Sequence, residues 1–146
     1  MIREMRADDR QIYLTLATEF YSTDAVSHRV PQAVFERTFA EITRPGGTVT
    51  GYLFVSEGEV AGYALTSRMF SPEVGGIVLW LEEVYLRPAY RGRGLGGEFF
   101  RMVKAMDGIC RLRLEVMPGN ERAKALYRRQ GFAPLEYEQM FLDREP

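Results

Sequence analysis

A glycine-rich turn constrains this chain more than any other feature of its sequence. Residues 91–97 read Arg-Gly-Arg-Gly-Leu-Gly-Gly, directly after the apolar run 76–86. They open a helix expected over 94–106, where apolar residues recur every three or four positions. The start of a helix carries unpaired N–H groups and a partial positive charge, and glycine lets a ligand approach the backbone closely. The turn therefore predicts a site for a phosphate-bearing ligand.

Four other interpretations of this turn are weaker. Gly92, Gly94 and Gly97 fit the dinucleotide pattern G-x-G-x-x-G, with Glu115 near the distance of a ribose-binding acid. A Rossmann domain needs several further βα units, and only roughly 50 residues remain. No Gly-Lys-Ser/Thr follows as in a Walker loop, and the kinase elements are missing. A purely structural turn would explain the glycines but not Arg91 and Arg93.

The pattern of the whole chain, residues 1–146, predicts one domain of the mixed α+β class. Strands are expected over 2–6, 48–56, 60–68, 76–86 and 111–117, with one or two more within 132–142. Helices are expected from Asp8 or Asp9 to about residue 20, from Pro31 to about residue 42, over 94–106 and over 120–130. Residues 57–59 suit a hairpin turn. An antiparallel first half followed by a β-α-β-α half predicts a mixed sheet with helices packed on it.

Composition excludes several classes of function. Nineteen Lys and Arg face 20 Asp and Glu, so the net charge of -1 lacks the basic excess typical of nucleic-acid binding. No apolar stretch approaches the roughly 20 residues of a membrane span, and the N-terminus lacks the apolar core of a signal peptide. We therefore expect no nucleic-acid or membrane partner and a cytoplasmic location. The single cysteine, Cys110, excludes an intramolecular disulfide and is expected to be buried.

Two adjacent acids interrupt the apolar run 76–86. Burying Glu82 and Glu83 without partners would cost several kcal/mol. Neighbouring strand residues face opposite sides of a sheet, so each face would receive one acid unless a bulge intervenes. The structural alternative is a pair of salt bridges to Arg111 or Arg113 on the next strand. The one histidine, His28, lies in the irregular stretch 21–30 and suits a surface position, and no Cys/His/acid spacing predicts a metal site.

At these residues the chain resembles the GNAT superfamily of N-acetyltransferases. Its hallmark Q/R-x-x-G-x-G/A matches Arg91, Gly94 and Gly96, and its second signature matches residues 120–127 with Gly131-Phe132. The resemblance covers essentially the full chain and is closest in motif style to the polyamine and small-amine acetyltransferases. It implies a mostly antiparallel mixed sheet with helices on both faces. Two parallel strands, ending near Leu86 and Met117, are expected to splay apart.

The resemblance also implies a site for acetyl-coenzyme A as co-substrate, with no metal. The pyrophosphate is expected on the backbone of Arg91, Gly92, Arg93, Gly94, Leu95, Gly96 and Gly97. The pantetheine arm is expected along Val84, Tyr85 and Leu86. Asn120 is by itself a good N-cap, and in relatives this asparagine often contacts the cofactor as well.

By the same resemblance, Tyr127 would protonate the leaving thiolate, whereas the residues alone also allow a core tyrosine. Relatives with adjacent acids use the first as the base, which indicates Glu82, with Glu83 as second choice. The expected activity is acetyl transfer to the primary amine of a small molecule by direct attack in a ternary complex. A protein or peptide acceptor, or a non-catalytic acetyl-coenzyme A sensor, remains the alternative. We expect a homodimer, with residues 21–29 shaping the acceptor pocket.

Overall fold

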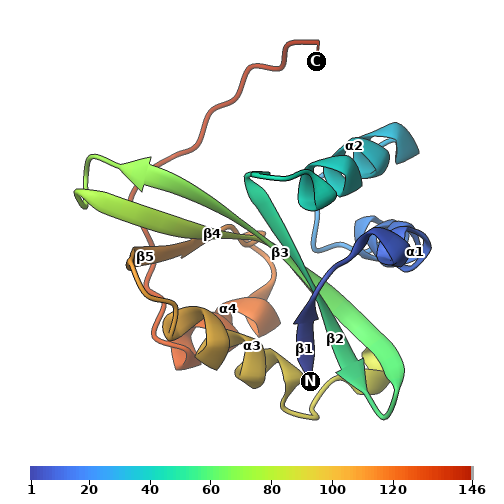
Figure 1. Ribbon diagram of the computed structural model, residues 1–146. Helices are drawn as coiled ribbons and strands as arrows, with labels where there is room; N and C mark the ends of the chain where they lie inside the picture. Colours follow the sequence, from blue (N-terminus) through green and yellow to red (C-terminus); the bar gives the residue numbers. More distant parts are fainter. Residues whose placement is uncertain (146) are drawn as a thin grey trace.

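The computed structural model describes residues 1–145 and consists of one sheet with helices on both faces (Figure 1). The five strands follow one another in the order of the sequence, β1-β2-β3-β4-β5. All neighbours pair antiparallel except β4 and β5, which are parallel. The strands are β1 (Ile2–Glu4), β2 (Val49–Ser56), β3 (Glu59–Ser71), β4 (Gly76–Leu86) and β5 (Ile109–Leu114). The expected mixed α+β fold is confirmed.

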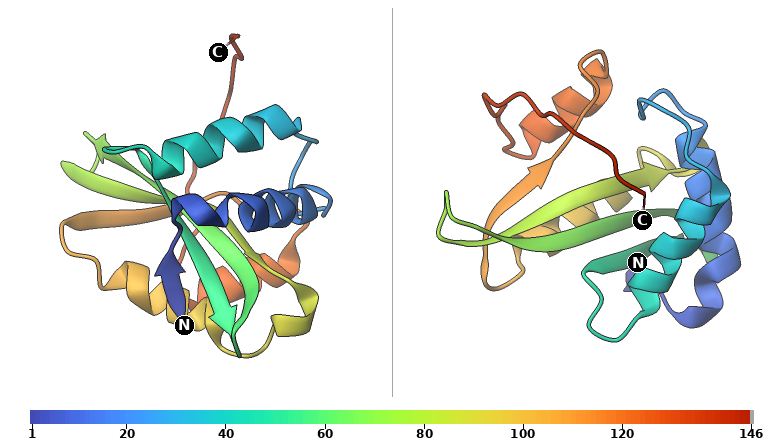
Figure 2. Two further views of the ribbon diagram at one scale, coloured as in Figure 1. Left: turned by 45° about the vertical axis from the view of Figure 1, so that its right-hand side comes forward. Right: turned by 90° about the horizontal axis from the view of Figure 1, so that it is seen from above.

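Helices α1 (Arg10–Tyr21) and α2 (Gln32–Thr43) cover one face of the sheet, and α3 (Leu95–Lys104) and α4 (Glu121–Arg129) cover the other (Figure 2). Each face has its own apolar cluster. On α1 the buried side chains recur at helical spacing and meet Tyr63 and Leu65 of β3. On α3, Leu95, Phe99 and Phe100 pack against the opposite face. The sheet thus separates two distinct environments.

The hairpin expected at residues 57–59 is confirmed, and its geometry explains the glycine. β2 ends at Ser56 and β3 begins at Glu59, so two residues make the turn. Glu57 has φ 54° and Gly58 has φ 82°. Positive φ at both positions belongs to the type I′ turn, whose twist matches that of paired strands.

Two expectations about the C-terminal third are wrong. No strand forms over residues 132–142, and residues 133–145 are exposed throughout. A strand needs a neighbour for its backbone hydrogen bonds, and within the described chain this segment has none. Cys110 is exposed rather than buried, because it lies near the start of β5, the last strand of the sheet. The strand expected over 111–117 is shifted to 109–114.

Candidate functional site

A β-bulge in β4 brings the two adjacent acids to the same face of the sheet. Leu65 of β3 pairs with Glu83, but Thr66 pairs with Leu81, so Glu82 is the extra residue. The side chain of Glu82 accepts a hydrogen bond from Ser67, and that of Glu83 accepts one from Tyr63. Tyr63 and Ser67 occupy alternate positions of β3, so their side chains point to the same face of the sheet. Both carboxylates therefore face α1 and α2. The sequence allowed for a bulge at these two acids, and the structure contains one.

Glu83 is half-buried, and its pKa reflects this burial. The hydroxyl of Tyr21, at the end of α1, donates to one carboxylate oxygen at 2.7 Å, and that of Tyr63 donates to the other at 2.5 Å. Burial raises the pKa of Glu83 above its ordinary value. The hydrogen bonds from the two hydroxyls lower the pKa of Glu83, whereas the negative charge of Glu82 raises it further. This carboxyl therefore takes up a proton more readily than an ordinary glutamate.

Glu82 has a different environment from Glu83. Its side chain is exposed and bonded only to Ser67 within residues 1–145. The salt bridges considered as the structural alternative are not formed by either acid in the described chain. Arg111 instead lies 3.3 Å from Glu73, and the guanidinium of Arg113 lies 4.4 Å from the centre of the Trp80 ring. The environment expected of a buried base is therefore found at Glu83.

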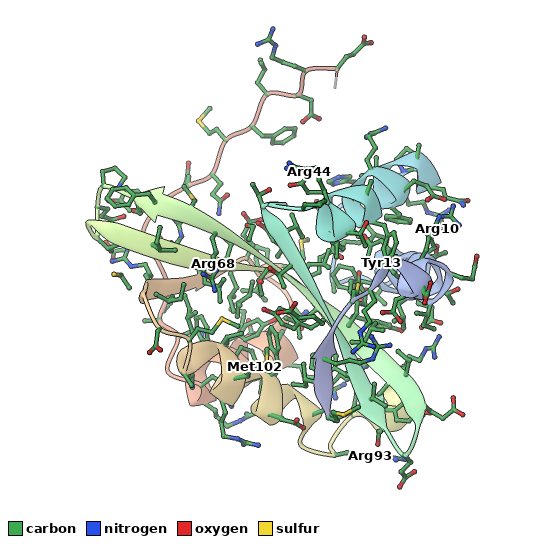
Figure 3. All side chains as sticks on the ribbon, viewed as in Figure 1. Arg10, Tyr13, Arg44, Arg68, Arg93 and Met102 are labelled. Atoms are coloured by element: carbon green, nitrogen blue, oxygen red, sulfur yellow. The ribbon has the colours of Figure 1, made fainter. Side chains whose placement is uncertain are left out.

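Aromatic side chains from distant parts of the chain surround the Glu83 carboxylate. Tyr13 of α1, which is labelled in Figure 3, packs edge-on against Tyr63, and the ring centres are 5.7 Å apart. Tyr21 packs against Phe35 of α2 at 5.2 Å. Residues Ala25, Val26 and Val30 of the connecting segment lie on the same cluster. His28 is on the surface, as expected, with Ser27 Oγ 2.9 Å from its Nδ1.

A second polar network fixes the end of α1 to the end of β4. Arg87 donates hydrogen bonds of 2.8 and 2.9 Å to Glu19, and a third of 3.0 Å to the carbonyl of Val60. The Tyr85 hydroxyl lies 3.3 Å from Glu19. Arg87 holds the pKa of Glu19 below its usual range. These bonds position α1, and with it Tyr21, over the bulge.

The strands β4 and β5 separate at the level of the two acids. Their parallel pairing ends at Leu81 and Leu114, whereas β4 continues to Leu86. Val84, Tyr85 and Leu86 therefore leave one edge of β4 without a strand partner among residues 1–145. Tyr85 is buried on the α1 face, while Val84 and Leu86 pack with the α3 cluster. The expected splayed pair is confirmed, and Glu83 lies where the splay begins.

The glycine-rich turn follows β4 after a short 3-10 helix (Pro88–Tyr90) and leads into α3. Gly94 is the residue before the helix, with φ 83° and ψ -4°, a conformation that a residue with a Cβ rarely adopts. A Cβ built on Gly92, Gly94 or Gly96 would meet no atom within 4 Å. The backbone at these three glycines therefore borders open space. That space leaves room for the phosphate group that the sequence predicts at this helix start.

The two arginines of the turn are engaged with the protein. Arg91 donates from Nε to the carbonyl of Leu86 at 2.8 Å. Arg93, which is labelled in Figure 3, lies 3.6 Å from Glu57 in the β2–β3 turn, and its guanidinium carbon lies 5.2 Å from the centre of the Tyr90 ring. Both arginine side chains remain exposed despite these contacts. Leu95 is buried and anchors the helix start to the core.

On α4, Asn120 caps the helix, as its residue type predicted. Its side-chain oxygen accepts from the Ala123 N–H at 3.1 Å. Tyr127 packs edge-on against Phe100 and Phe132, each with ring centres 6.0 Å away. Its hydroxyl makes no hydrogen bond within residues 1–145, and burial raises its pKa. It is therefore a protonated phenol with an unused donor.

Sequence reasoning missed the two tyrosines that hold Glu83. Tyr21 lies 62 positions from Glu83 and Tyr63 lies 20 positions away. Tyr63 alternates with Leu65 on an apolar strand, and Tyr21 ends an amphipathic helix, so both matched ordinary core positions. The available signal was the register of the hairpin, because pairing β3 with β4 around a bulge places Tyr63 beside Glu83.

Comparison with known proteins assigns the family. The model of the acetyltransferase (GNAT) family matches residues 10–132. The chain therefore belongs to the GNAT family and is an acetyltransferase. The thialysine N-ε-acetyltransferase of Mus musculus is 29% identical over 143 residues, covering 87% of this chain and 80% of that protein. The Bos taurus protein of the same name is 39% identical over 75 residues, covering 49% of this chain and 44% of that protein.

Solved structures share the fold across the chain. A possible acetyltransferase from Clostridium difficile 630 has a TM-score of 0.83 at 20% identity, covering 100% of this chain and 98% of that chain. The aminoglycoside acetyltransferase AAC(6')-Iy, in complex with a bisubstrate analog, has a TM-score of 0.80 at 18% identity, covering 99% and 97%. At these identities the likeness extends to the fold alone.

Neither a membrane-spanning helix nor a metal cluster is found within residues 1–145. No helix there is both long enough and apolar enough to cross a membrane. No three His, Cys, Asp or Glu side chains of that range gather as a metal site would require.

Proposed function

We propose that this acetyltransferase uses acetyl-coenzyme A to acetylate the primary amine of a small molecule, by direct attack in a ternary complex. The observation that carries the proposal is the half-buried Glu83 carboxylate, bonded by two tyrosine hydroxyls, at the point where β4 separates from β5. At this point the carboxyl group of Glu83, with its raised pKa, lies next to the unpaired edge of β4. Transfer from a thioester to an amine needs both a base and a slot for the donor.

The base is needed because the acceptor arrives charged. An aliphatic amine has a reference pKa near 10.4, so at pH 7 only about one molecule in 2,500 is neutral. Reaching that neutral form costs roughly 4.6 kcal/mol, at 1.36 kcal/mol per pKa unit. Glu83 would accept the proton directly or through water, held in place by Tyr21 and Tyr63. We thus move the base from Glu82, the first choice from sequence, to Glu83.

The donor would lie on the other side of the splayed strands. The first turn of α3 would hold the pyrophosphate, and the open edge of Val84, Tyr85 and Leu86 would pair with the pantetheine arm. Acetyl-coenzyme A supplies the activated acyl group. Tyr127 would donate its phenolic proton to the sulfur of the departing thiolate, since its hydroxyl is protonated and uncommitted.

A small cationic acceptor fits the site better than a peptide. Glu82 and Glu83 face the same side of the sheet and favour an ammonium group there. Residues Ala25, Val26 and Val30 pack over the aromatic cluster and reduce the space above it. The related proteins named for thialysine and aminoglycoside acetylation act on small amines. A homodimeric assembly and a cytoplasmic location also remain proposals.

The test is acetyl-coenzyme A consumption, followed as thiol release, with a panel of acceptors. The panel contains thialysine and lysine, polyamines, an aminoglycoside and peptides with a free N-terminus. We expect turnover with at least one small amine and little with peptides. Turnover with peptides alone would indicate a protein acetyltransferase. Acetyl-coenzyme A binding without turnover on any acceptor would indicate a sensor.

A further inference from the structure

Among the half-buried arginines of residues 1–145, Arg113 alone lacks an acidic partner. The other three are Arg3, Arg87 and Arg111, and they form ion pairs with carboxylates at 2.7, 2.8 and 3.3 Å respectively. Taking a guanidinium partly out of water costs free energy unless an anion compensates its charge. Arg113 is therefore a cation whose compensating anion has to come from a ligand.

The guanidinium of Arg113 is already held in place. It lies 4.4 Å from the centre of the Trp80 ring, and Trp80 is its direct neighbour across β4 and β5. The indole N–H of Trp80 in turn lies 2.9 Å from the sulfur of Met69. A guanidinium on an aromatic ring keeps its planar fork of N–H donors, which matches the two oxygens of a carboxylate. Because the side chain is held in advance, binding costs it little further freedom.

Arg113 and Trp80 face the same side of the sheet as the two acids. The residues that flank each of them in their strands pack with the α3 cluster, so both side chains point to the opposite face, as Glu82 and Glu83 do. Trp80 belongs to neither apolar cluster of the described chain. The part of β3 and β4 near their hairpin extends beyond α1 and α2 (Figure 2). This part of the acceptor face therefore lies beside the two helices and not beneath them.

The register of the strands gives the spacing between Arg113 and the base. Trp80 pairs with Ser67 of β3. Glu83 pairs with Leu65, so the bulge leaves two steps of β3 between them, about 7 Å. An extended chain advances about 3.4 Å for every three bonds, so this span corresponds to about six bonds. An amine at Glu83 and a carboxylate over Trp80 would thus be the two ends of one small molecule.

Glu82 lies between these two points but is turned away from Arg113. Its carboxylate accepts a hydrogen bond from Ser67, which is on β3. Arg113 reaches Trp80 from β5, on the other side of β4. The negative and the positive charge are therefore on opposite sides of β4, and a bound carboxylate can contact Arg113 without lying against Glu82.

We propose that Arg113, held on Trp80, binds a carboxylate of the acceptor while Glu83 receives its amine. The acceptor then carries an amine and a carboxylate about six bonds apart, as the side-chain amine and carboxylate of lysine are. Arg113 selects such an amino acid over a diamine or an amide of the same length. This inference rests on the proposed function, because it names the acceptor of the same site. Arg113 determines specificity and takes no part in the proton transfer.

Lysine and lysinamide test this subsite, because they share both amines and differ only in the carboxylate. For the wild type, kcat/KM for lysine should exceed that for lysinamide by at least about tenfold, as expected for hydrogen bonds to a charged group. Arg113→Gln should remove most of this preference, and Arg113→Lys, which keeps the charge without the planar fork, should keep part of it. Arg111→Gln is the matched control on the same face of β5 and should keep the preference. Circular dichroism of each variant checks the fold.

The ratio of the two acceptors separates a binding role from a structural one. If Arg113→Gln lowers kcat/KM equally for lysine and lysinamide, Arg113 only supports the fold and the proposal is overturned. A wild type without preference for lysine overturns it too, as does turnover of other small amines but not of lysine, although that result supports the proposed function. If no acceptor is turned over, the proposed function fails, and calorimetry of lysine binding with coenzyme A present decides the subsite. Weaker binding by Arg113→Gln then supports it, and equal binding overturns it.

Discussion

The two faces of the sheet differ in how the sequence supplies their functional groups. On the α3/α4 face, the expected cofactor groups come from two short stretches, residues 84–97 and 120–127. On the α1/α2 face, Glu83 is held by tyrosines 62 and 20 positions away. Contiguous groups can be recognised as motifs, whereas dispersed groups cannot. The first face therefore reveals the family, and the second carries the groups that would select an acceptor.

The two faces also differ in charge. The α3 side offers the N–H groups and partial positive charge of a helix start, with Arg91 and Arg93 nearby. The α1 side offers two carboxylates and phenolic hydroxyls around them. An anionic donor and a cationic acceptor would be attracted to opposite faces and meet at the splay. Changes on one face should therefore affect chemistry on the acceptor, and changes on the other should affect the donor.

The largest effect is expected from Glu83→Gln, which keeps the shape and removes the base. We expect kcat/KM near neutral pH to fall by about 10²–10⁴-fold, the usual contribution of general acid–base catalysis. Burial raises the pKa of Glu83. The activity of the wild type should therefore increase with pH along an acidic limb whose midpoint lies above the ordinary glutamate pKa of about 4.3. In Glu83→Gln this acidic limb should disappear, and calorimetry should show unchanged acetyl-coenzyme A binding.

Glu82→Gln sharpens this result, because Glu82 lies next to Glu83 but is exposed. We expect it to keep the acidic limb. Loss of the limb in Glu82→Gln and its survival in Glu83→Gln would return the role to the acid that the sequence favoured. An intact limb in both would mean that water, or an already neutral acceptor, replaces the base.

The next effect is expected from Tyr127→Phe, on the donor face. Turnover should fall about a hundredfold, within the range for a lost general acid, while the acetyl-coenzyme A dissociation constant changes little because the ring keeps its contacts with Phe100 and Phe132. Tyr52→Phe, a buried tyrosine of the same cluster, is the control and should retain turnover. Equal single-turnover rates for Tyr127→Phe and the wild type would make Tyr127 a core residue only.

A smaller effect, on binding alone, is expected from Gly94→Val. The dissociation constant for acetyl-coenzyme A should rise at least tenfold, about 1.4 kcal/mol, since the side chain strains a φ of 83° and enters the space where phosphate would lie. Gly108→Val is the control, because Gly108 has φ 74° and open surroundings in the turn before β5. Calorimetry on both variants separates strain from ligand contact. Equal affinity in the two would contradict the phosphate site.

The smallest effect is expected from Tyr21→Phe, on the acceptor face. It removes one hydrogen bond to the ionised Glu83, so the ionised form loses stability and the pKa of Glu83 rises further. Hydrogen bonds to charged groups are worth about 1.5–3 kcal/mol, so the acidic limb should move upward by about one to two pH units. Tyr13→Phe, whose hydroxyl does not bond Glu83, should leave the limb in place. A limb unmoved by Tyr21→Phe would show that Glu83 is not the titrating group.

Local patterns determined the elements and the donor face of this protein. Helix periodicity, the turn residues at 57–58 and the glycines at 92–97 act over a few residues, so the sequence predicts them directly. The Asn120 cap is equally local, and the expectation that it caps a helix is confirmed. The splayed pair of strands, β4 and β5, was also predicted, because two motifs resemble those of a known family.

Only the tertiary structure decided which acid is enclosed and by what. Alternation alone would place Glu82 and Glu83 on opposite faces, and the one-residue bulge against Thr66 and Leu65 turns both to one side. Burial then depends on α1, whose end is held by Arg87 and Glu19 and carries Tyr21 to the bulge. The C-terminal segment shows the same limit, since its pattern favours a strand but no neighbour is present in the chain itself. Strand pairing and desolvation are set by groups far apart in sequence, and local propensity does not encode them.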